Sequence, residues 1–434
     1  MPRPGSRPLA AAALGVLALM YVALAVPVAA PGSTVVLAAA DRSPNWLLGP
    51  WRAFGTSGAD GELTGPLYYA GLWLAMLAYV GVLASARAIG ARVAVAAIVA
   101  FHLLFLLAPP LLSQDVFSYI SYARLDVVHG LNPYTHSPDA VPQDAAFVFA
   151  GSKDATSAYG PLFTLATYPL AKLSVPAAFW TLKTLAALAS LGVVALTAAC
   201  ARRLGRDPVF AALAVGTNPL VLVHVVGGAH NDALTVLLTM AGALALLAAR
   251  ERPAGLAGAA GAAVKASAGL ALAFFVAGTR ERLAVIRGAV AAFVLATAAA
   301  VLAFGSHALD AFVLIGENQG RTTRWSLPQR AADGISGVTG ASSDTVVDFT
   351  RGVFAALFAL ALALLVRRAW RARDGAHWIE AAGWATLALL LASAWLVPWY
   401  AIWVLPLAAL AGSRLLLAGT LALCAYMLVI AVPL

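Results

Sequence analysis

The sequence predicts an all-α protein that crosses a membrane many times. Of its 434 residues, 62% are hydrophobic and only 11% are charged, and the mean hydropathy is +0.86. Soluble globular proteins carry roughly 25% charged residues. The apolar residues gather in runs of about 20, the length that an α-helix needs to cross roughly 30 Å of hydrocarbon. We therefore predict a single integral membrane domain over residues 1–434, a polytopic bundle of about 11–13 transmembrane helices.

The first apolar run, residues 8–30, follows Arg3 and Arg7. Such flanks are also typical of a signal peptide, but the run is long enough to span a bilayer, so we interpret it as a retained first span. The other spans are predicted at 66–84, 93–112, 176–200, 208–227, 233–249, 283–304, 352–366, 379–397, 400–412 and 415–433.

The distribution of charge predicts the orientation of the chain. Most arginines lie in short loops between the apolar runs, and short basic loops stay in the cytoplasm. The loops 31–65, 113–175 and 305–350 then lie outside, where most of the carboxylates also are. The net charge of +9 is thus explained by topology, and no nucleic-acid partner is expected. The two cysteines, Cys200 and Cys424, provide neither a disulfide framework nor a metal-binding spacing.

Residues 254–278 depart from this pattern. The segment is apolar and rich in glycine and alanine, has Lys265 at its centre, and is flanked by basic loops on both sides. One span cannot begin and end on the same side of a membrane. Two half-helices that enter from the cytoplasm and return would satisfy the charges, provided that protein or a cavity surrounds the turn. Two tight full spans are the alternative.

The longest polar and aromatic segment begins at residue 113, after a Pro-Pro pair that ends a span. Ser113 is expected to cap a new helix whose first turn holds Asp115, where a carboxylate suits the helix dipole. Tyr119 and Tyr122 follow at i+4 and i+7, on the same face, and Gly130 suits the helix end. The segment is therefore read as a surface helix that presents a carboxylate and two phenols. An interfacial helix with an aromatic belt is the structural alternative.

Further polar and aromatic residues follow in the same loop. Asn132 and Tyr134 belong to an Asn-Pro-Tyr-Thr-His turn, and Tyr159 begins a Tyr-Gly-Pro turn before a short apolar stretch at 161–173. That stretch is short for a span, so we expect an interfacial or re-entrant helix. Together with Asp115, these residues suggest a shaped pocket.

Two groups of polar residues lie at the edge of or within predicted spans. His230, Asn231 and Asp232 are contiguous at an outer boundary, where polar groups are costly unless they have a role; a helix cap is the alternative for Asp232, and a metal site is weakly indicated. Lys265 lacks an evident route to water, which favours an anionic partner such as a lipid phosphate. Lys183 is near the outer end of its span and is expected to snorkel.

The late part of the chain contains cations and aromatics near an interface. Arg321, Arg324 and Arg330 surround a tryptophan in the loop 305–350, and guanidinium groups suit phosphate; a solvated loop is the alternative. Trp399 and Tyr400 follow a proline at an outer boundary, where an aromatic belt is the alternative explanation.

Taken in order, these motifs resemble those of the actinobacterial polyprenol-phosphomannose-dependent α-1,6-mannosyltransferases, within the glycosyltransferase-C superfamily. The resemblance extends from residue 113 to about residue 400 and rests on these motifs: Asp115 to Tyr119, Gly130 to His136, Tyr159 to Leu162, Asn218 to Leu220, Gly228 to Asp232, Val264-Lys265 and Pro398 to Tyr400.

The resemblance implies a glycosyltransferase-C-like bundle whose extracytoplasmic loops form the catalytic face at the plasma membrane. It implies a polyprenyl-phosphate mannose donor, a mannan or lipomannan acceptor, an α-1,6 product formed with inversion, and Asp115 as the catalytic base. Two spans more than in some relatives precede Asp115. Candidate substrate-binding residues are Tyr119, Tyr122, Asn132, Tyr134, Tyr159, His230, Asn231, Asp232, Trp399 and Tyr400. Lys265, Arg321 and Arg324 are candidates for the phosphate, and no cofactor or obligate metal is expected.

Two other functions fit parts of the sequence. A transporter or flippase of a lipid-linked sugar would share the intramembrane lysines and the broken segment at 254–278. The polar residues gather at one face instead of the midplane, however, and no clear internal repeat is present. A lipid-linked glycosyltransferase for another sugar, such as arabinose or glucose, is the second alternative.

Overall fold

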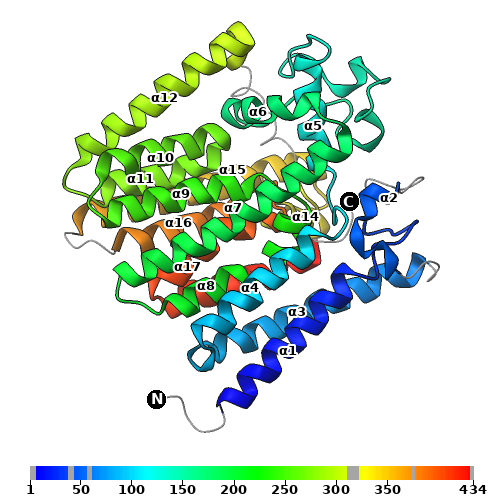
Figure 1. The fold of residues 1–434 in the computed structure, drawn as a ribbon. Coiled ribbons are helices and arrows are strands. Elements are labelled where there is room, and N and C mark those ends of the chain that lie inside the picture. Colours follow the sequence, from blue (N-terminus) through cyan, green and yellow to red (C-terminus); the bar gives the residue numbers. More distant parts are fainter. Residues whose placement is uncertain (1–5, 38–43, 56–60, 310–321, 373–376, 431–434) are drawn as a thin grey trace.

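A computed structural model of the chain describes residues 6–37, 44–55, 61–309, 322–372 and 377–430. Within these ranges the regular secondary structure is helical and no β-strand is present. The prediction of an all-α polytopic membrane protein is confirmed. The helices are stacked side by side, with α1 (Ser6–Ala25) and α3 (Gly61–Ala84) along one edge and α12 (Arg282–Phe304) along the opposite edge (Figure 1).

The remaining helices fill the space between these edges. They are α4 (Ala91–Leu106), α7 (Val175–Arg203), α8 (Pro208–Gly216), α9 (Asp232–Leu247), α10 (Glu251–Val264), α11 (Gly269–Ala277), α14 (Leu327–Thr339), α15 (Ser343–Arg371), α16 (His377–Ala392), α17 (Ala401–Ala411) and α18 (Arg414–Ile430). The short helices α2 (Asn45–Leu48), α5 (Asp115–Val127) and α6 (Pro161–Thr167) gather at one end of the bundle (Figure 1).

Fewer helices than predicted are long enough to cross a membrane by themselves. In the described ranges five qualify: Arg7–Ala25, Gly65–Ala84, Val175–Arg203, Arg282–His307 and Ser343–Arg371. A sixth arises if α8 and the π-helix η7 (Val221–Gly227), which are bent by 63° relative to each other, are taken as one broken span. By length and composition the described residues thus provide five or six spans where about 11–13 transmembrane helices were predicted, because several of the predicted runs form apolar helices of only 10–17 residues. Apolar composition predicts burial but not an unbroken helix.

The break between α8 and η7 is supported by the first two long helices. Tyr21 of α1 donates a hydrogen bond to the Thr217 carbonyl at 2.6 Å, and Tyr79 of α3 donates to the Ala214 carbonyl at 2.6 Å. A helix that breaks inside an apolar bundle leaves carbonyl groups that must find donors. The two phenols supply them, so α1 and α3 stabilise the broken helix that leads to residue 230.

Helices α10 and α11 form a hairpin with Lys265 at its turn. Gly258 faces Leu272 and Phe275, and Gly261 faces Ala268, so the two helices run antiparallel. The backbone of Lys265 is extended, with φ −154° and ψ 123°, which ends α10. The segment 254–278 thus forms a hairpin of two helices, as predicted, and with 14 and 9 residues both are shorter than a full span. The short, non-spanning helix predicted in 161–173 is also present as α6.

The three predicted outer loops meet at one end of the bundle. Gln114 donates through its side chain to the Leu37 carbonyl at 3.0 Å, which joins the first and second of these loops. Asn132 donates through its side chain to the carbonyl of Phe304 at 3.1 Å, next to the third. Predicted inner segments also meet, since Arg282 donates to the Trp370 carbonyl at 3.2 Å. Segments that the charge pattern assigns to the same side of the membrane are therefore in contact with one another in the structure.

The predicted outer loop 305–350 contains helical structure, namely α14 and the first turns of α15; Ser326 caps α14 by accepting a hydrogen bond from the Gln329 backbone at 3.4 Å. One local expectation is wrong. Lys183 does not snorkel: it is fully buried and donates to the carbonyls of Ala108 and Pro109, just beyond the end of α4. An ammonium group at a helix C-terminus satisfies carbonyls that have no donor of their own.

Candidate functional site

Asp115 is the first residue of α5, and its carboxylate is partly exposed. The N-cap residue of α5 is Gln114 and not Ser113, which the sequence had predicted. The Ser113 hydroxyl instead accepts a hydrogen bond from the Asp115 backbone at 3.2 Å. Leu112 precedes this turn with φ +53°, a backbone conformation that is uncommon for a residue other than glycine. The chain therefore leaves the end of α4 through a constrained turn that orients α5.

The predicted aromatic face of α5 is present and meets the Tyr-Gly-Pro turn. The ring of Tyr159 lies edge-on to Tyr119 at 4.7 Å and 6.1 Å from Tyr122. Burial and the nearby Asp115 carboxylate raise the pKa of Tyr119 and of Tyr159 well above 10. Both hydroxyl groups therefore stay protonated and remain donors at neutral pH. Gly130, with φ +68°, follows the end of α5 as expected.

Asp115 faces His230 across the site. The Nδ1 atom of His230 lies 3.4 Å from the Oδ2 atom of Asp115; the Asp115 side chain is 35% exposed, whereas that of His230 is fully buried. Burial raises the pKa of the Asp115 carboxyl, but the nearby imidazole of His230, the ammonium of Lys265 and the hydroxyl of Tyr159 outweigh this effect. The pKa of Asp115 thus lies below its ordinary 3.8, and the group is ionised at neutral pH.

The imidazole of His230 is held in one orientation. It stacks on the ring of Trp399 at 3.8 Å with an interplanar angle of 16°. A Cβ on Gly228 would lie 2.4 Å from the His224 carbonyl oxygen and 3.0 Å from the imidazole carbon Cδ2, so the backbone can pass here only with glycine. Ala229, between them, has φ +57°, and strained backbone of this kind is concentrated at functional sites.

Asp232 forms an ion pair instead of a helix cap. Its buried carboxylate accepts hydrogen bonds from the Lys265 ammonium at 2.8 and 3.0 Å and from the Trp403 indole at 2.6 Å. Residue 231 is the N-cap of α9 and makes no side-chain capping bond. The cap alternative is therefore excluded, and Asp232 ties the start of α9 to the turn of the α10–α11 hairpin.

Aromatic side chains surround the Lys265 ammonium. Its nitrogen lies 4.7 Å from the ring centroid of Tyr400 and 5.4 Å from that of Trp403, and these two rings stack at 4.0 Å. Such contacts stabilise a partly desolvated cation. Trp403 was not among the predicted site residues. Its position at i+4 from Trp399, at the start of a helix, is the sequence signal that could have found it.

The turn that carries Tyr159 packs directly on the hairpin. Gly160 donates a backbone hydrogen bond to the Val264 carbonyl at 3.2 Å. A Cβ on Gly160 would lie 2.2 Å from the Ala263 carbonyl oxygen, so only glycine allows this approach. The contact places Tyr159 beside the residue that precedes Lys265.

Three predicted substrate-binding residues already have polar partners within the protein. The Tyr122 hydroxyl donates to the carbonyl of Ala155 at 2.9 Å, and that of Tyr134 donates to the carbonyl of Tyr159 at 2.8 Å. The Asn132 side chain bridges the Phe304 carbonyl and the Tyr134 backbone. These contacts shape the loop around the site, and a direct role in sugar binding stays a prediction.

The predicted arginines are not joined to this group by any contact in the described ranges. Arg321 lies outside the described residues. Arg324 is exposed, with its guanidinium 5.3 Å from the Trp325 ring, and Arg330 lies 5.1 Å from the same ring.

Several buried polar atoms of the site have no hydrogen-bond partner in the described part of the chain. They are both ring nitrogens of His224, both ring nitrogens of His230, and the amide nitrogen and oxygen of Asn231. Buried polar groups without partners are costly, and in native proteins water or a bound ligand commonly satisfies them. Among the described residues no group of three His, Cys, Asp or Glu side chains is arranged to hold a metal ion.

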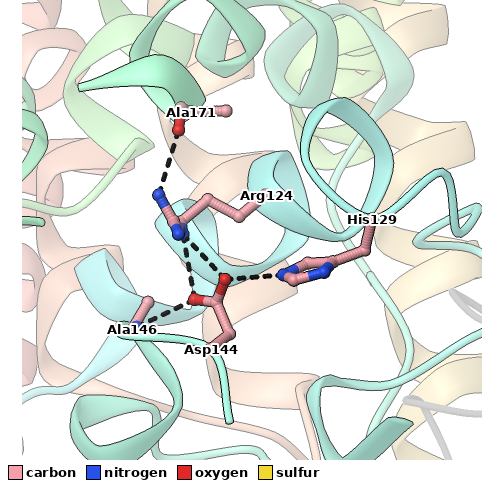
Figure 2. Close-up of polar contacts among 5 residues, drawn as sticks. All are labelled: Arg124, His129, Asp144, Ala146 and Ala171. Carbon is pink, nitrogen blue, oxygen red and sulfur yellow. Dashed lines mark hydrogen bonds and ion pairs between the residues drawn. The ribbon is translucent and has the colours of Figure 1, made fainter. Parts of the chain in front are cut away.

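A second polar cluster fixes the other end of α5 (Figure 2). Arg124 contacts both carboxylate oxygens of Asp144 at 2.9 and 3.0 Å and donates to the Ala171 carbonyl at 3.1 Å. His129 lies 2.7 Å from Asp144, which also accepts a hydrogen bond from the Ala146 backbone. Because these contacts join α5 to the loop before α6, they hold the Asp115 helix against the rest of the segment 113–175.

Comparison with known proteins identifies the family. A family described as Alpha-(1->6)-mannopyranosyltransferase, N-terminal domain, matches residues 12–280, and a second, described as MptB C-terminal domain, matches residues 330–434. The chain belongs to the alpha-(1->6)-mannopyranosyltransferase family. The first match includes Asp115, His230, Asp232 and Lys265, and the second includes Trp403, so the site is built where the two matched segments meet.

Similar proteins come from mycobacteria and a corynebacterium. The chain is 33% identical over 146 residues to a probable alpha-(1->6)-mannopyranosyltransferase of Mycolicibacterium smegmatis, covering 32% of this chain and 26% of that protein. It is 32% identical over 179 residues to alpha-(1->6)-mannopyranosyltransferase A of Mycobacterium tuberculosis (39% and 34%), and 27% identical over 177 residues to the protein of that name from Corynebacterium glutamicum (39% and 35%). The matches thus span about a quarter to a third of the length of these relatives. No solved structure matches the chain.

Proposed function

We propose that this protein transfers mannose from a polyprenyl-phosphate mannose to a mannan or lipomannan acceptor. The product is an α-1,6 linkage formed with inversion, on the outer face of the plasma membrane. The observation that carries the proposal is the pairing, within one site, of a partly exposed carboxylate, Asp115, with a cation, Lys265, that influences its ionisation. Membership of the alpha-(1->6)-mannopyranosyltransferase family supports the sugar and the linkage.

Asp115 has the properties of a general base. It is ionised at neutral pH, it is more exposed than its partner His230, and it stands at the start of a rigid helix. A base must reach the proton that it removes and must be unprotonated at the working pH. The lowered pKa of Asp115 meets the second condition, and the 35% exposure of its side chain leaves the carboxylate accessible to an acceptor hydroxyl.

Lys265 has the properties of a group that binds the leaving phosphate. An ammonium group has three N–H donors, and two of them are directed at the Asp232 carboxylate. The third donor and the 21% exposure of the Lys265 side chain leave one contact for a phosphate oxygen. Stabilisation of the charge that develops on the leaving group is a major contribution to catalysis of this kind.

The proposed reaction is a single displacement. The acceptor hydroxyl oxygen attacks the anomeric carbon as its proton moves to an Asp115 oxygen. The new carbon–oxygen bond forms while the bond from the anomeric carbon to the phosphate oxygen breaks, and polyprenyl phosphate leaves with the bonding electron pair. Attack from the face opposite the phosphate converts a β-linked donor into an α-linked product. Tyr119, Tyr159, Asn231, Trp399 and Tyr400 border this site and are candidates to orient the sugars.

The end of the bundle that holds the site also fits a lipid-linked donor. The predicted outer loops meet there, and most arginines lie in the loops predicted to be cytoplasmic. The polyprenyl tail would lie in the bilayer, with its phosphate at the interface near the hairpin turn. No metal is required in this scheme, and full transfer in excess EDTA is the expected result.

The test is a transfer assay with labelled polyprenyl-phosphate mannose and a short α-1,6-mannoside. Asp115→Asn and Asp115→Ala should lose transfer by about 100-fold or more, because general base catalysis contributes roughly 10²–10⁴ in rate. Asp154→Asn, an exposed carboxylate of the same loop, is the matched control and should keep wild-type activity. Size-exclusion elution and thermal unfolding check that each variant is folded. Near wild-type transfer by a folded Asp115 variant would contradict the base assignment.

The same assay separates the alternatives. A flippase would move the labelled donor across proteoliposome membranes without forming a mannosylated product. A transferase of other specificity would use a polyprenyl-phosphate arabinose or glucose instead. The broken α10–α11 segment is the feature that a transporter would share, but its turn is bound by Asp232 at one end of α9.

A further inference from the structure

We propose that His230 is a positioning residue that holds the Asp115 carboxylate in its reactive orientation through Nδ1. The inference rests on the proposed function, since it assigns a role to His230 behind the proposed base. It differs from the sugar-binding role expected from the sequence. The geometry of three side chains carries it, those of Asp115, His230 and Trp399.

The exposed fractions of the two side chains show that Asp115 faces the solvent and that His230 lies behind it. Asp115 is 35% exposed and His230 is fully buried, so a substrate hydroxyl reaches the carboxylate and not the imidazole. The Nδ1 atom of His230 lies 3.4 Å from Asp115 Oδ2, which is long for a hydrogen bond, and neither ring nitrogen has another partner in the described ranges. Hydrogen bonds in unliganded active sites are often long and shorten when substrate binds.

The surroundings of the imidazole prevent other orientations. Trp399 covers one face at 3.8 Å, and Gly228 approaches the Cδ2–Nε2 edge so closely that a Cβ there would lie at 3.0–3.1 Å. The His230 backbone donates to the Val225 carbonyl at 3.0 Å, within the π-helix η7. π-Helical turns are frequent at functional sites. The stacking on Trp399 and the close approach of Gly228 thus confine the ring, and in the structure its Nδ1 atom faces the carboxylate.

Other groups also act on Asp115, so the effect of His230 must be separated from theirs. Lys265 and the Tyr159 hydroxyl, together with His230, lower the pKa of the Asp115 carboxyl, while burial raises it. Tyr119 and Tyr400 also lie near this carboxylate. Loss of His230 alone removes one of the stabilising contacts and leaves Lys265 and Tyr159 in place. The Asp115 pKa should then rise.

The experiment compares His230→Gln, His230→Asn and His230→Ala in the mannose transfer assay as a function of pH. The Asn carboxamide nitrogen reaches about the position of Nδ1, whereas the Gln carboxamide reaches toward Nε2, and Ala has no polar group. Gln and Ala should lower kcat on the order of 10- to 100-fold and move the acid limb of kcat/KM to higher pH. Asn should retain more activity and a limb closer to that of the wild type. The KM for the lipid donor should change little in all three.

His377→Asn, at an exposed histidine that begins α16 outside the site, is the control and should keep the wild-type profile. If Gln does not fold, the comparison of Ala with Asn still separates loss of the Nδ1 donor from loss of the ring. A folded Gln or Ala variant with wild-type kcat and an unchanged acid limb would overturn the proposal. So would equal defects in Asn and Ala. If Asp115→Asn keeps transfer activity, the proposed role of Asp115 is contradicted, and this inference falls with it. If Asp115→Asn is inactive but the pH profiles of the His230 variants match that of the wild type, only this inference is contradicted.

Discussion

The ammonium of Lys265 donates to both carboxylate oxygens of Asp232, at 2.8 and 3.0 Å, across 33 positions of sequence. This ion pair joins the first residue of α9 to the turn of the α10–α11 hairpin. It brings a cation to the site at a fixed position and balances its charge. Asp232 is thereby a partner of the proposed phosphate-binding residue, whatever else it contacts when substrate is bound.

Breaking this pair from one side should destabilise the protein. Asp232→Asn leaves an ammonium without its counter-ion, and Lys265→Met leaves a fully buried carboxylate unpaired, at a cost of about 3 kcal/mol each. The double variant removes both charges and should recover much of the stability without recovering transfer. Thermal unfolding in detergent, followed by tryptophan fluorescence, measures the first effect. Single variants as stable as the wild type would show that the pair contributes little.

Gly160→Ala should loosen the contact between the Tyr-Gly-Pro turn and the hairpin. The added Cβ would meet the Ala263 carbonyl oxygen at 2.2 Å, and overpacking of this kind costs about 1–3 kcal/mol. We expect a lower unfolding temperature and reduced transfer, because Tyr159 moves with the turn. Gly334→Ala is the control: it lies in α14 with nothing within 4 Å, so alanine should be neutral or stabilising there. Equal stability of the two variants would contradict the close contact.

Removal of the tyrosine hydroxyls that support the α8–η7 break should lower stability. Tyr21→Phe and Tyr79→Phe each leave a carbonyl without its donor, at about 1 kcal/mol or more per variant. Tyr68→Phe provides the comparison on α3, because the Tyr68 hydroxyl is buried without a partner in the described part of the chain. Its loss should be neutral or stabilising. Unfolding temperatures that fall equally in all three variants would argue against the capping role.

The Arg124–Asp144–His129 cluster should make stability depend on acid pH. Burial raises the pKa of the Asp144 carboxyl, but Arg124, His129 and the Ala146 backbone outweigh it, so the pKa lies below its ordinary 3.8. A carboxyl with a lowered folded-state pKa stabilises the fold above its unfolded pKa and loses that contribution as pH falls through the folded value. Asp144→Asn should therefore be less stable than the wild type at pH 6.

The difference between Asp144→Asn and the wild type should shrink as the pH falls from about 4 toward 2, because Asp144 is then protonated in both states. Chemical unfolding at stepped pH values measures this difference. Asp154→Asn, which changes an exposed carboxylate of the same loop, should show no comparable pH dependence. A constant difference between Asp144→Asn and the wild type at all pH values would contradict the charge-based explanation.

Much of the architecture follows from local patterns in the sequence. Apolar run lengths predicted a helical membrane protein, charges grouped the loops that meet at each end, and flanking arginines predicted the hairpin around Lys265. The 3.6-residue period placed Asp115 with two tyrosines on one face of α5. These features depend on neighbours within a few turns of the same helix, so the sequence alone was enough to determine them.

Only the tertiary structure decided which side chains face one another across the bundle. It paired Asp115 with His230 and buried Lys183 against the end of α4. It also directed the Asp232 carboxylate to Lys265 and Trp403, so that this side chain does not cap α9. It also replaced several expected spans with short or broken helices. Such outcomes depend on the rotation, crossing and interruption of helices that are distant in the chain. Packing of the whole bundle sets them, and no local period in the sequence encodes them.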